Sequence, residues 1–339
     1  MTRERMPAGV RRRRPTAIGA TALSLLVLAL GVAAPASASP ITRAGVTDGT
    51  LRVAGGPADE QITLRLSASD ANQLQVDLGA DGSADFTFDL GTFRAIEVTA
   101  GNGDDTVRID QVNGAFTTTK ATRIDGGNGD DTLLGGSGAE VFLGGNGDDL
   151  VDGNGGIDTG LLGRGDDVFV WDPGDGSDIV EGGRGSDTMV FNGAAGNEVL
   201  TASAAGRRVL FTRNLGNIVM DLADVEVIDV RALGGTDTVA VNDVTGTGLR
   251  RVDVDLAAAP GGATGDGQAD TVTVAATNGD DTIAVDANGA AVEVNGLPAF
   301  VRITHADGAG DTLVIDTGAG GDDVVLDPAL DGLILVAIL

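Results

Sequence analysis

Residues 126–170 read GGNGDDTLL, GGSGAEVFL, GGNGDDLVD, GNGGIDTGL and LGRGDDVFV when they are divided into units of nine. After a two-residue insert, Trp171-Asp172, the series continues as PGDGSDIVE and GGRGSDTMV and ends at Val190. These seven units share one length and one pattern. A short repeating period is typical of a solenoid, in which each repeat packs only on its neighbours. The stretch therefore predicts a stack of coils.

Each position of the unit has a physical role. Glycines at the first, second and fourth positions allow a tight turn with positive φ and let backbone carbonyls approach one another. The sixth position adds a carboxylate beside those carbonyls. The eighth position points inward from a short strand, and two units close one coil of about 18 residues. The eighth positions are Leu133, Phe142, Val151, Gly160, Phe169, Val180 and Met189, and Gly160 is expected to leave a hole.

Stacking places alternate units above one another, about 4.8 Å apart. One side then carries Asp131, Asp149, Asp167 and Asp187, and the other carries Glu140, Asp158 and Asp178. Two carboxylates about 5 Å apart repel by about 3 kcal/mol at an effective dielectric constant of ~20, and a divalent cation between the turns reverses the sign. Ca²⁺ fits better than Mg²⁺ because it accepts many oxygen ligands in a flexible geometry. Softer metals prefer His or Cys ligands.

The units at 126–134 and 144–152 resemble the calcium-binding nonapeptide of haemolysin-type (RTX) proteins, G-G-x-G-x-D-x-U-x. The resemblance covers 126–190 and implies a right-handed parallel β-roll with several Ca²⁺ ions between its turns. Carried over residue by residue, the implied ligands are Asp131, Asp149, Asp167, Asp187, Glu140, Asp158, Asp178, Gly127, Gly129, Gly145, Gly147 and Gly165. The side with Glu140 and Asp158 is expected to bind more weakly, because Glu replaces Asp and Asn154 replaces a turn glycine.

The same residues recur outside the repeats at irregular spacing. The segments 101–107 (GNGDDTV) and 278–283 (NGDDTI) nearly repeat the motif and add Asp105 and Asp281 to the expected ligands. Alternating segments such as 251–256 (RVDVDL) predict strands, and no convincing helix follows residue 38. We therefore expect an all-β fold, a β-roll or β-solenoid with irregular flanking rungs. Its expected parts are an N-terminal β segment or cap at 39–123, the calcium-binding roll at 124–190 and an irregular C-terminal solenoid at 191–339.

The first 38 residues have the pattern of a signal peptide. A basic region that ends at Arg14 precedes the apolar stretch 17–34, and Ala36-Ser37-Ala38 forms a small-x-small cleavage site. Arg13-Arg14 lack the hydrophobic pair expected in a twin-arginine signal, so the general secretory route is favoured. The chain is expected to be secreted or extracellular, with retention at the cell surface left open. No later segment has the ~18 apolar residues of a membrane span.

Composition excludes several classes of protein. The chain has 22 Lys+Arg and 50 Asp+Glu, and removal of residues 1–38 takes away six Arg and one Glu, which leaves 16 against 49, a charge of -33. Such a charge argues against nucleic-acid binding, which needs a basic patch. Without Cys there is no disulfide or thiol nucleophile, and a single His cannot form a His-rich metal centre.

No catalytic residue is assigned. His305 stands where a strand meets a Gly/Asp turn, Trp171 is expected to cover the core, and the EF-hand-like segment 77–85 lacks its closing Glu, which favours a hairpin turn. The favoured function is a structural or adhesive extracellular protein that binds calcium and a cell-surface or extracellular polymer. The alternative is a β-helix-type carbohydrate-active enzyme, because paired carboxylates suffice for glycoside hydrolysis. A carboxylate pair outside the repeat register, beside Arg and an aromatic residue, would favour the enzyme.

Overall fold

The computed structural model describes residues 43–308 and 310–339, which belong to one compact unit. The expected signal peptide lies outside the described residues. Their regular secondary structure consists of strands and short 3₁₀ turns, without an α-helix, and no described helix is long and apolar enough to cross a membrane. The short 3₁₀ turns are η1 (Leu90–Thr92), η2 (Thr117–Thr119), η3 (Leu215–Asn217) and η4 (Pro328–Leu330).

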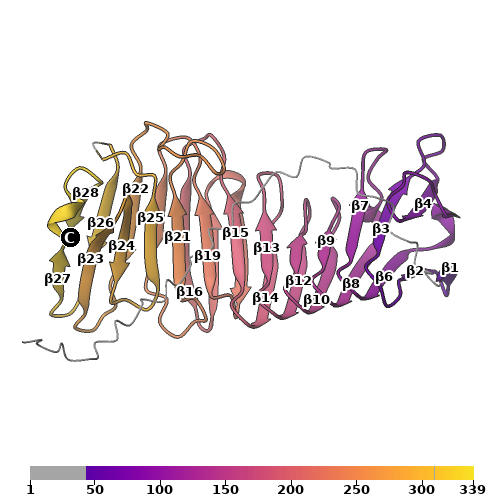
Figure 1. The fold of residues 1–339 in the computed structure, drawn as a ribbon, viewed down its shortest axis with the longest axis horizontal. Helices are drawn as coiled ribbons and strands as arrows, with labels where there is room; N and C mark the ends of the chain where they lie inside the picture. Colours follow the sequence, from indigo (N-terminus) through magenta and orange to yellow (C-terminus); the bar gives the residue numbers. More distant parts are fainter. Residues whose placement is uncertain (1–42, 309) are drawn as a thin grey trace, which may run out of the picture. The chain divides into compact units, whose positions relative to one another are not determined.

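Two sheets of 14 strands each form the walls of the solenoid (Figure 1). Sheet A has the order β1 (Arg43–Thr47), β2 (Thr50–Ala54), β6 (Ala95–Asn102), β8 (Ala121–Asn128), β10 (Glu140–Asn146), β12 (Thr159–Arg164), β14 (Ile179–Arg184), β18 (Ile218–Ala223), β17 (Arg208–Arg213), β16 (Val199–Ala205), β20 (Thr238–Val241), β22 (Thr271–Ala275), β26 (Thr312–Asp316) and β28 (Leu335–Ile338). Sheet B has the order β27 (Asp323–Leu326), β23 (Thr282–Asn288), β24 (Ala291–Asn295), β25 (Phe300–Thr304), β21 (Arg251–Asp255), β19 (Val227–Arg231), β15 (Thr188–Asn192), β13 (Val168–Trp171), β11 (Leu150–Asp152), β9 (Thr132–Leu134), β7 (Thr106–Asp110), β3 (Gln61–Leu66), β4 (Gln73–Leu78) and β5 (Phe86–Asp89).

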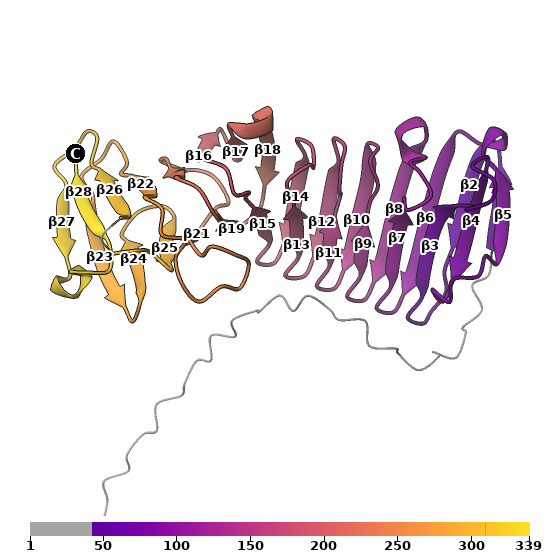
Figure 2. The same ribbon diagram turned by 90° about the horizontal axis from the view of Figure 1, so that it is seen from above.

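From β6 to β15 the chain alternates between the two sheets, and each strand pairs in parallel with the next strand of its own sheet (Figure 2). Val141 pairs with Thr159, and Thr132 with Leu150, so one coil contains 18 residues as the period predicted. Phe142 pairs with Gly160, which shows that the register does not slip just before Leu162, which replaces a turn glycine. The expected all-β solenoid is confirmed.

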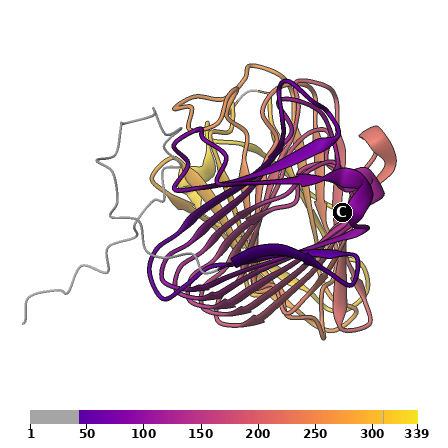
Figure 3. The same ribbon diagram turned by 90° about the vertical axis from the view of Figure 1, so that its right-hand side faces the viewer.

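The view along the stacked coils shows the strands of the two sheets around a common interior (Figure 3), and the buried apolar side chains of both sheets form one core there. The apolar eighth positions of the repeats are all fully buried. The hole expected at Gly160 is absent, because the Phe169 ring reaches across the core and would lie 3.0 Å from a Cβ at Gly160. Trp171 is also fully buried, with its ring centroid 4.1 Å from that of Phe191, which confirms its expected place in the core.

The irregular rungs arise from antiparallel hairpins that are inserted into the parallel sheets. In sheet A, β16, β17 and β18 form a meander between β14 and β20. In sheet B, β23, β24 and β25 do the same beside β21, and β3, β4 and β5 form the other end. These inserts lengthen the coils, and the sheets nevertheless continue without a break on both sides of the nonapeptide stretch.

Candidate metal centre

The sixth-position aspartates of alternate units form one continuous row with carboxylates from the coils on either side, and we call it the first inner row. Its members are Glu60, Asp105, Asp131, Asp149, Asp167, Asp187 and Glu226. The backbone N–H of each member donates to the carboxylate of the member in the next coil, over 2.7, 2.8, 2.8, 2.8, 3.0 and 2.9 Å in that order. The predicted stacking of alternate units is therefore confirmed, and the row extends beyond the repeats at both ends.

The other side of the coils carries a shorter second inner row. The N–H of Glu140 donates to Asp158 Oδ1 over 2.7 Å, and that of Asp158 donates to Asp178 Oδ1 over 2.8 Å. The two-residue insert at Trp171-Asp172 lengthens this step by two residues without breaking it. The division of the repeat carboxylates between two sides is as predicted.

Each row leaves buried oxygen atoms without a partner. The aspartates of the first inner row are at most 1 % exposed. One oxygen of each carboxylate accepts the N–H of the coil before, and the other, Oδ2, has no hydrogen-bond partner in Asp105, Asp131, Asp149, Asp167 and Asp187. Glu140 Oε1 and Asp158 Oδ2 are in the same state. An ionised oxygen buried without a partner is strongly unfavourable, so each position favours either a proton or a cation.

Burial also shifts the acidity of these groups. Burial raises the pKa of Asp149 to about 7, opposed by the hydrogen bond from the Asp131 N–H and reinforced by the charges of Asp167 and Asp131. The same cause raises the pKa of Asp105 and of Asp187 to about 7 and that of Asp158 to about 9. A bound cation would act in the opposite direction, because a neighbouring positive charge favours the carboxylate.

The glycines of the motif are required by close contacts within and between turns. A Cβ at Gly144 would lie 2.4 Å from Asp149 Oδ2, so the first glycine makes room for the carboxylate of its own turn. Gly145 has a φ of +124°, and its Cβ would lie 2.1 Å from the carbonyl oxygen of Gly127 in the coil before. Both contacts exclude any larger residue. The expected ligands Gly127, Gly129, Gly145, Gly147 and Gly165 all have positive φ and stand in these stacked turns.

The turns already contact one another directly. The N–H groups of Gly103, Gly129, Gly147 and Gly165 donate to the backbone carbonyls of Asn128, Asn146, Arg164 and Arg184, over 2.8 to 2.9 Å. Among the described residues, no three Asp, Glu or His side chains converge to form a ready metal cage. A cation at these turns would therefore be held by one or two carboxylates together with backbone carbonyls, which are ordinary ligands of Ca²⁺.

A second series of carboxylates, not anticipated from the sequence, runs beside the first inner row. It consists of the exposed fifth-position residues Asp59, Asp104, Asp130, Asp148 and Asp166. Here the hydrogen bonds run the other way, because the N–H of each later coil donates to the carboxylate of the coil before, over 2.8 to 3.0 Å. The repeated Asp-Asp pair of GNGDD was the available signal. The N–H of its first Asp donates to the coil before, and the N–H of its second Asp donates to the next coil.

The structure gives a role to Glu140, the one sixth-position residue of the repeats that is Glu rather than Asp. Glu60 begins the first inner row and Glu140 begins the second, and each uses Oε2 to accept the N–H four residues earlier, from Gly56 and Gly136, over 3.1 and 3.0 Å. The carboxylate of the first member thus binds its own turn, while its backbone N–H donates to the next member of the row. Glu140 is thus the start of the second inner row rather than an irregular Asp.

Asp281 stands apart from both rows of the repeats. Its N–H donates to Asp322 Oδ1 over 2.8 Å, and its Oδ2 accepts from the N–H and the hydroxyl of Thr277. All of its described acceptor contacts are local, and the side chain is only half-buried. The structure places Asp105 in the first inner row and Asp281 in a separate pair.

The other polar candidates have structural contacts. His305 Nδ1 lies 2.6 Å from Asp255 Oδ1. The EF-hand-like segment is the turn of the β4–β5 hairpin, as expected, and Asp77 Oδ2 accepts from Arg65 and from the Gly82 N–H.

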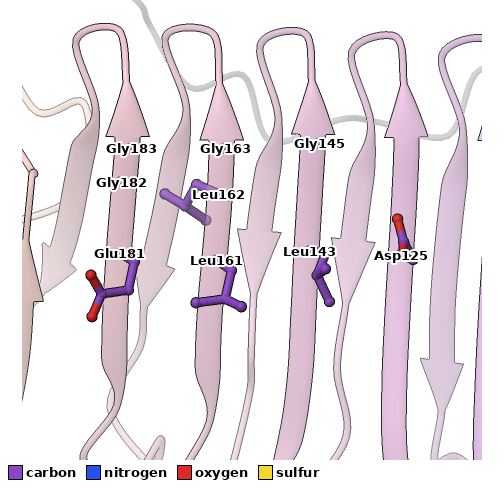
Figure 4. A pocket seen from close by; sticks show the side chains of 9 residues that line it. All are labelled: Asp125, Leu143, Gly145, Leu161, Leu162, Gly163, Glu181, Gly182 and Gly183. Atoms are coloured by element: carbon purple, nitrogen blue, oxygen red, sulfur yellow. The ribbon is translucent and has the colours of Figure 1, made fainter.

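The outer face of sheet A has a shallow hollow of about 330 Å³ above the turn glycines Gly145 and Gly163, with Leu143 and Leu161 beside it (Figure 4).

Without metal, the folded chain is expected to be more stable at pH 5 than at pH 8. An unfolded Asp ionises near pH 4, whereas folded Asp149 and Asp187 ionise near pH 7. The native state therefore holds more protons across this window, and its stability falls as the pH rises, by about 1.4 kcal/mol per pH unit for each such group. Urea unfolding in chelator at pH 5 to 8 measures the slope. A midpoint that rises with pH would contradict the raised pKa values.

No protein-family model matches this chain, and no curated protein sequence matches it either.

Proposed function

We propose that this protein is a calcium-binding β-solenoid with a structural or adhesive role outside the cell, in which calcium ions stabilise the stacked turns. One observation carries the proposal. Five successive aspartates of the first inner row, from Asp105 to Asp187, each have a buried carboxylate oxygen without a hydrogen-bond partner. None of these five aspartates takes part in an ion pair among the residues that the structure describes. A row of buried negative charges without basic partners favours a row of cations.

The residue types support Ca²⁺ over other cations. The available donors are carboxylate and backbone carbonyl oxygens, which are the ligands of hard cations, and the only His of the chain lies outside the rows. In this arrangement Oδ1 of each Asp holds the N–H of the coil before, and Oδ2 remains for the ion. When bound, calcium supplies the positive charge that the protein does not provide.

The carboxylate charge itself supports a role beyond hydrogen bonding. An Asn side chain also offers an oxygen to a backbone N–H, and the neighbouring third position does use Asn, with Asn128 and Asn146 linked side chain to side chain along the stack over 2.8 Å. The sixth position is nevertheless acidic in all seven units. If the row served only to accept N–H groups, Asn would do so without the cost of a buried charge.

The enzyme alternative has one group of residues in its favour. On the outer face of sheet B, Asp229 and Asp253 are paired neighbours, and Arg251 lies 5.6 Å from the ring of Phe300. Each carboxylate already has a basic partner, however: Arg231 lies 3.1 Å from Asp229, and Arg251 lies 2.8 Å from Asp253. We therefore interpret the group as ion pairs. Polysaccharide hydrolysis that Asp253→Asn abolishes would favour the enzyme instead.

Calcium titration by calorimetry tests the proposal on residues 39–339. We expect several ions to bind and Mg²⁺ to substitute poorly. Asp149→Asn keeps an oxygen for the Asp131 N–H but removes the charge between two coils, so it should raise the calcium midpoint by about tenfold, equivalent to about 1.4 kcal/mol. Asp158→Asn should have a smaller effect, because its row has only two steps.

A matched control is Asp130→Asn, which changes one of the exposed fifth-position aspartates beside the first inner row. It should change the calcium midpoint little. Absence of calcium binding by the parent chain would contradict the proposed function. A larger effect at Asp158 than at Asp149 would place the principal ions in the second inner row.

A further inference from the structure

A third inner row lies outside the nonapeptide stretch. The N–H of Glu198 donates to Asp237 Oδ1 over 2.8 Å, that of Asp237 to Asp270 Oδ1 over 2.7 Å, and that of Asp270 to Asp311 Oδ1 over 2.9 Å. The members are 39, 33 and 41 residues apart, because hairpins and long loops separate them. The row thus repeats the hydrogen-bond pattern of the first inner row at positions where no nonapeptide is present.

This row also contains a buried oxygen without a partner. Asp237 is 1 % exposed, and its Oδ2 has no hydrogen-bond partner. Two further carboxylates join the same stacked turns, since Asp266 Oδ2 accepts the Gly235 N–H over 3.0 Å and Asp307 Oδ2 accepts the Gly267 N–H over 2.6 Å. Five carboxylates therefore accept backbone N–H groups in these stacked turns, those of Asp237, Asp266, Asp270, Asp307 and Asp311.

The distribution of positive charge along the row is uneven. Glu198, its first member, is paired with the buried guanidinium of Arg213, which lies 5.3 Å from the Trp171 ring centroid. None of the five aspartates takes part in an ion pair among the described residues. The protein thus supplies a cation for the first member and none for the members that follow.

We propose that Asp237 is the central ligand of a further site for a hard divalent cation of the Ca²⁺ type, separate from the nonapeptide turns. The buried Oδ2 of Asp237 provides the central ligand, and backbone carbonyls and water complete the shell, as is common for Ca²⁺. The inference shares its choice of ion with the proposed function but depends on different residues. The C-terminal rungs are then ordered by their own cation.

Hydrogen-exchange mass spectrometry of residues 39–339 tests this site, with CaCl₂ alone as the probe and MgCl₂ as the comparison. Calcium should slow exchange in the peptide that covers 234–241 as well as in 126–190. Slowing in 126–190 alone would overturn this inference and leave the proposed function intact. Slowing in 234–241 alone would support this site and contradict the proposed function, and no slowing in either would overturn both.

Two variants make the test specific. Asp237→Asn retains an acceptor for the Glu198 N–H, so the fold should persist, but calcium-dependent protection of 234–241 should be lost while that of 126–190 is unchanged. Calorimetry should record the loss of one calcium equivalent. Asp243→Asn changes the charge equally at a carboxylate that accepts only from the Thr245 N–H, and it should behave as the parent. Unchanged protection and stoichiometry in Asp237→Asn would overturn the site.

Discussion

Chelation of calcium at pH 8 should lower the thermal midpoint of this protein more than any single substitution. Ligand binding to the native state stabilises it by RT ln(1 + [L]/Kd), which is about 2.7 kcal/mol per site when the ligand is at 100 times its Kd. Extracellular calcium modules commonly have a Kd of about 10⁻⁴ to 10⁻³ M. The first inner row offers about four gaps between Asp105 and Asp187, which together give on the order of 10 kcal/mol.

That sum is comparable to the whole stability of an ordinary domain, about 5–15 kcal/mol. The metal-free chain is therefore expected to be expanded or marginally folded at pH 8, and calcium should restore its β-sheet signal in circular dichroism. Thermal melts in 10 mM CaCl₂, 10 mM MgCl₂ and chelator measure the effect. Magnesium serves as the control for ionic strength and divalent charge. A β-sheet signal and a midpoint that chelator leaves unchanged would show that folding does not depend on metal.

Much of the fold could be predicted because its determinants are local. The nine-residue period determines the length of a coil, the alternation of inward and outward residues determines the core, and stacking then assigns the carboxylates to two sides. Each of these steps depends only on residues within one or two units. The expected hole at Gly160 was wrong for the complementary reason. Phe169 fills it from the opposite sheet, and such a contact across the core has no signal in the pattern of a single strand.

The third inner row could not be predicted from the glycine-rich nonapeptide, because its coils share only a shorter pattern. Asp105-Thr106-Val107, Asp237-Thr238-Val239, Asp270-Thr271-Val272 and Asp311-Thr312-Leu313 share an aspartate, a threonine and an apolar residue. In each case the Asp ends a turn, the Thr begins a strand on the outer face, and the apolar residue enters the core. This triplet marks a coil whether or not a nonapeptide precedes it.

The roles of the glutamates that begin the rows, and of the exposed fifth-position aspartates, could not be predicted for a different reason. Glu140 can be recognised as the start of a row only when the coil before it is known to lack a carboxylate at that place. Which of two adjacent aspartates is buried likewise depends on how a turn lies on its neighbour. The Asp-Asp pair of one repeat indicates two carboxylates in each turn, but their hydrogen-bond partners in the neighbouring coils are properties of the stack.

Phe169→Ala should be the most destabilising of the single core substitutions in the repeats. The side chain is 1 % exposed and fills the space above Gly160, and loss of a buried Phe side chain costs about 3–5 kcal/mol. Gly160→Ala should also destabilise the parent chain, by about 1–3 kcal/mol, because its Cβ would lie 3.0 Å from the Phe169 ring. Urea unfolding in saturating calcium measures both changes.

The two substitutions should compensate one another when they are combined. In a Phe169→Leu background the smaller side chain leaves room for the methyl group, so Gly160→Ala should become neutral or stabilising, with a coupling free energy of about 1–3 kcal/mol. Val272→Ala removes a buried residue of β22, in a rung outside the nonapeptide stretch, and should simply add to Gly160→Ala. Because Gly160 lies in sheet A and Phe169 in sheet B, coupling between them requires that the two residues face each other across one coil. Additive effects of Gly160→Ala and Phe169→Leu would mean that the coil closes in another register, and the assignment of Asp149 and Asp158 to opposite sides would be lost with it.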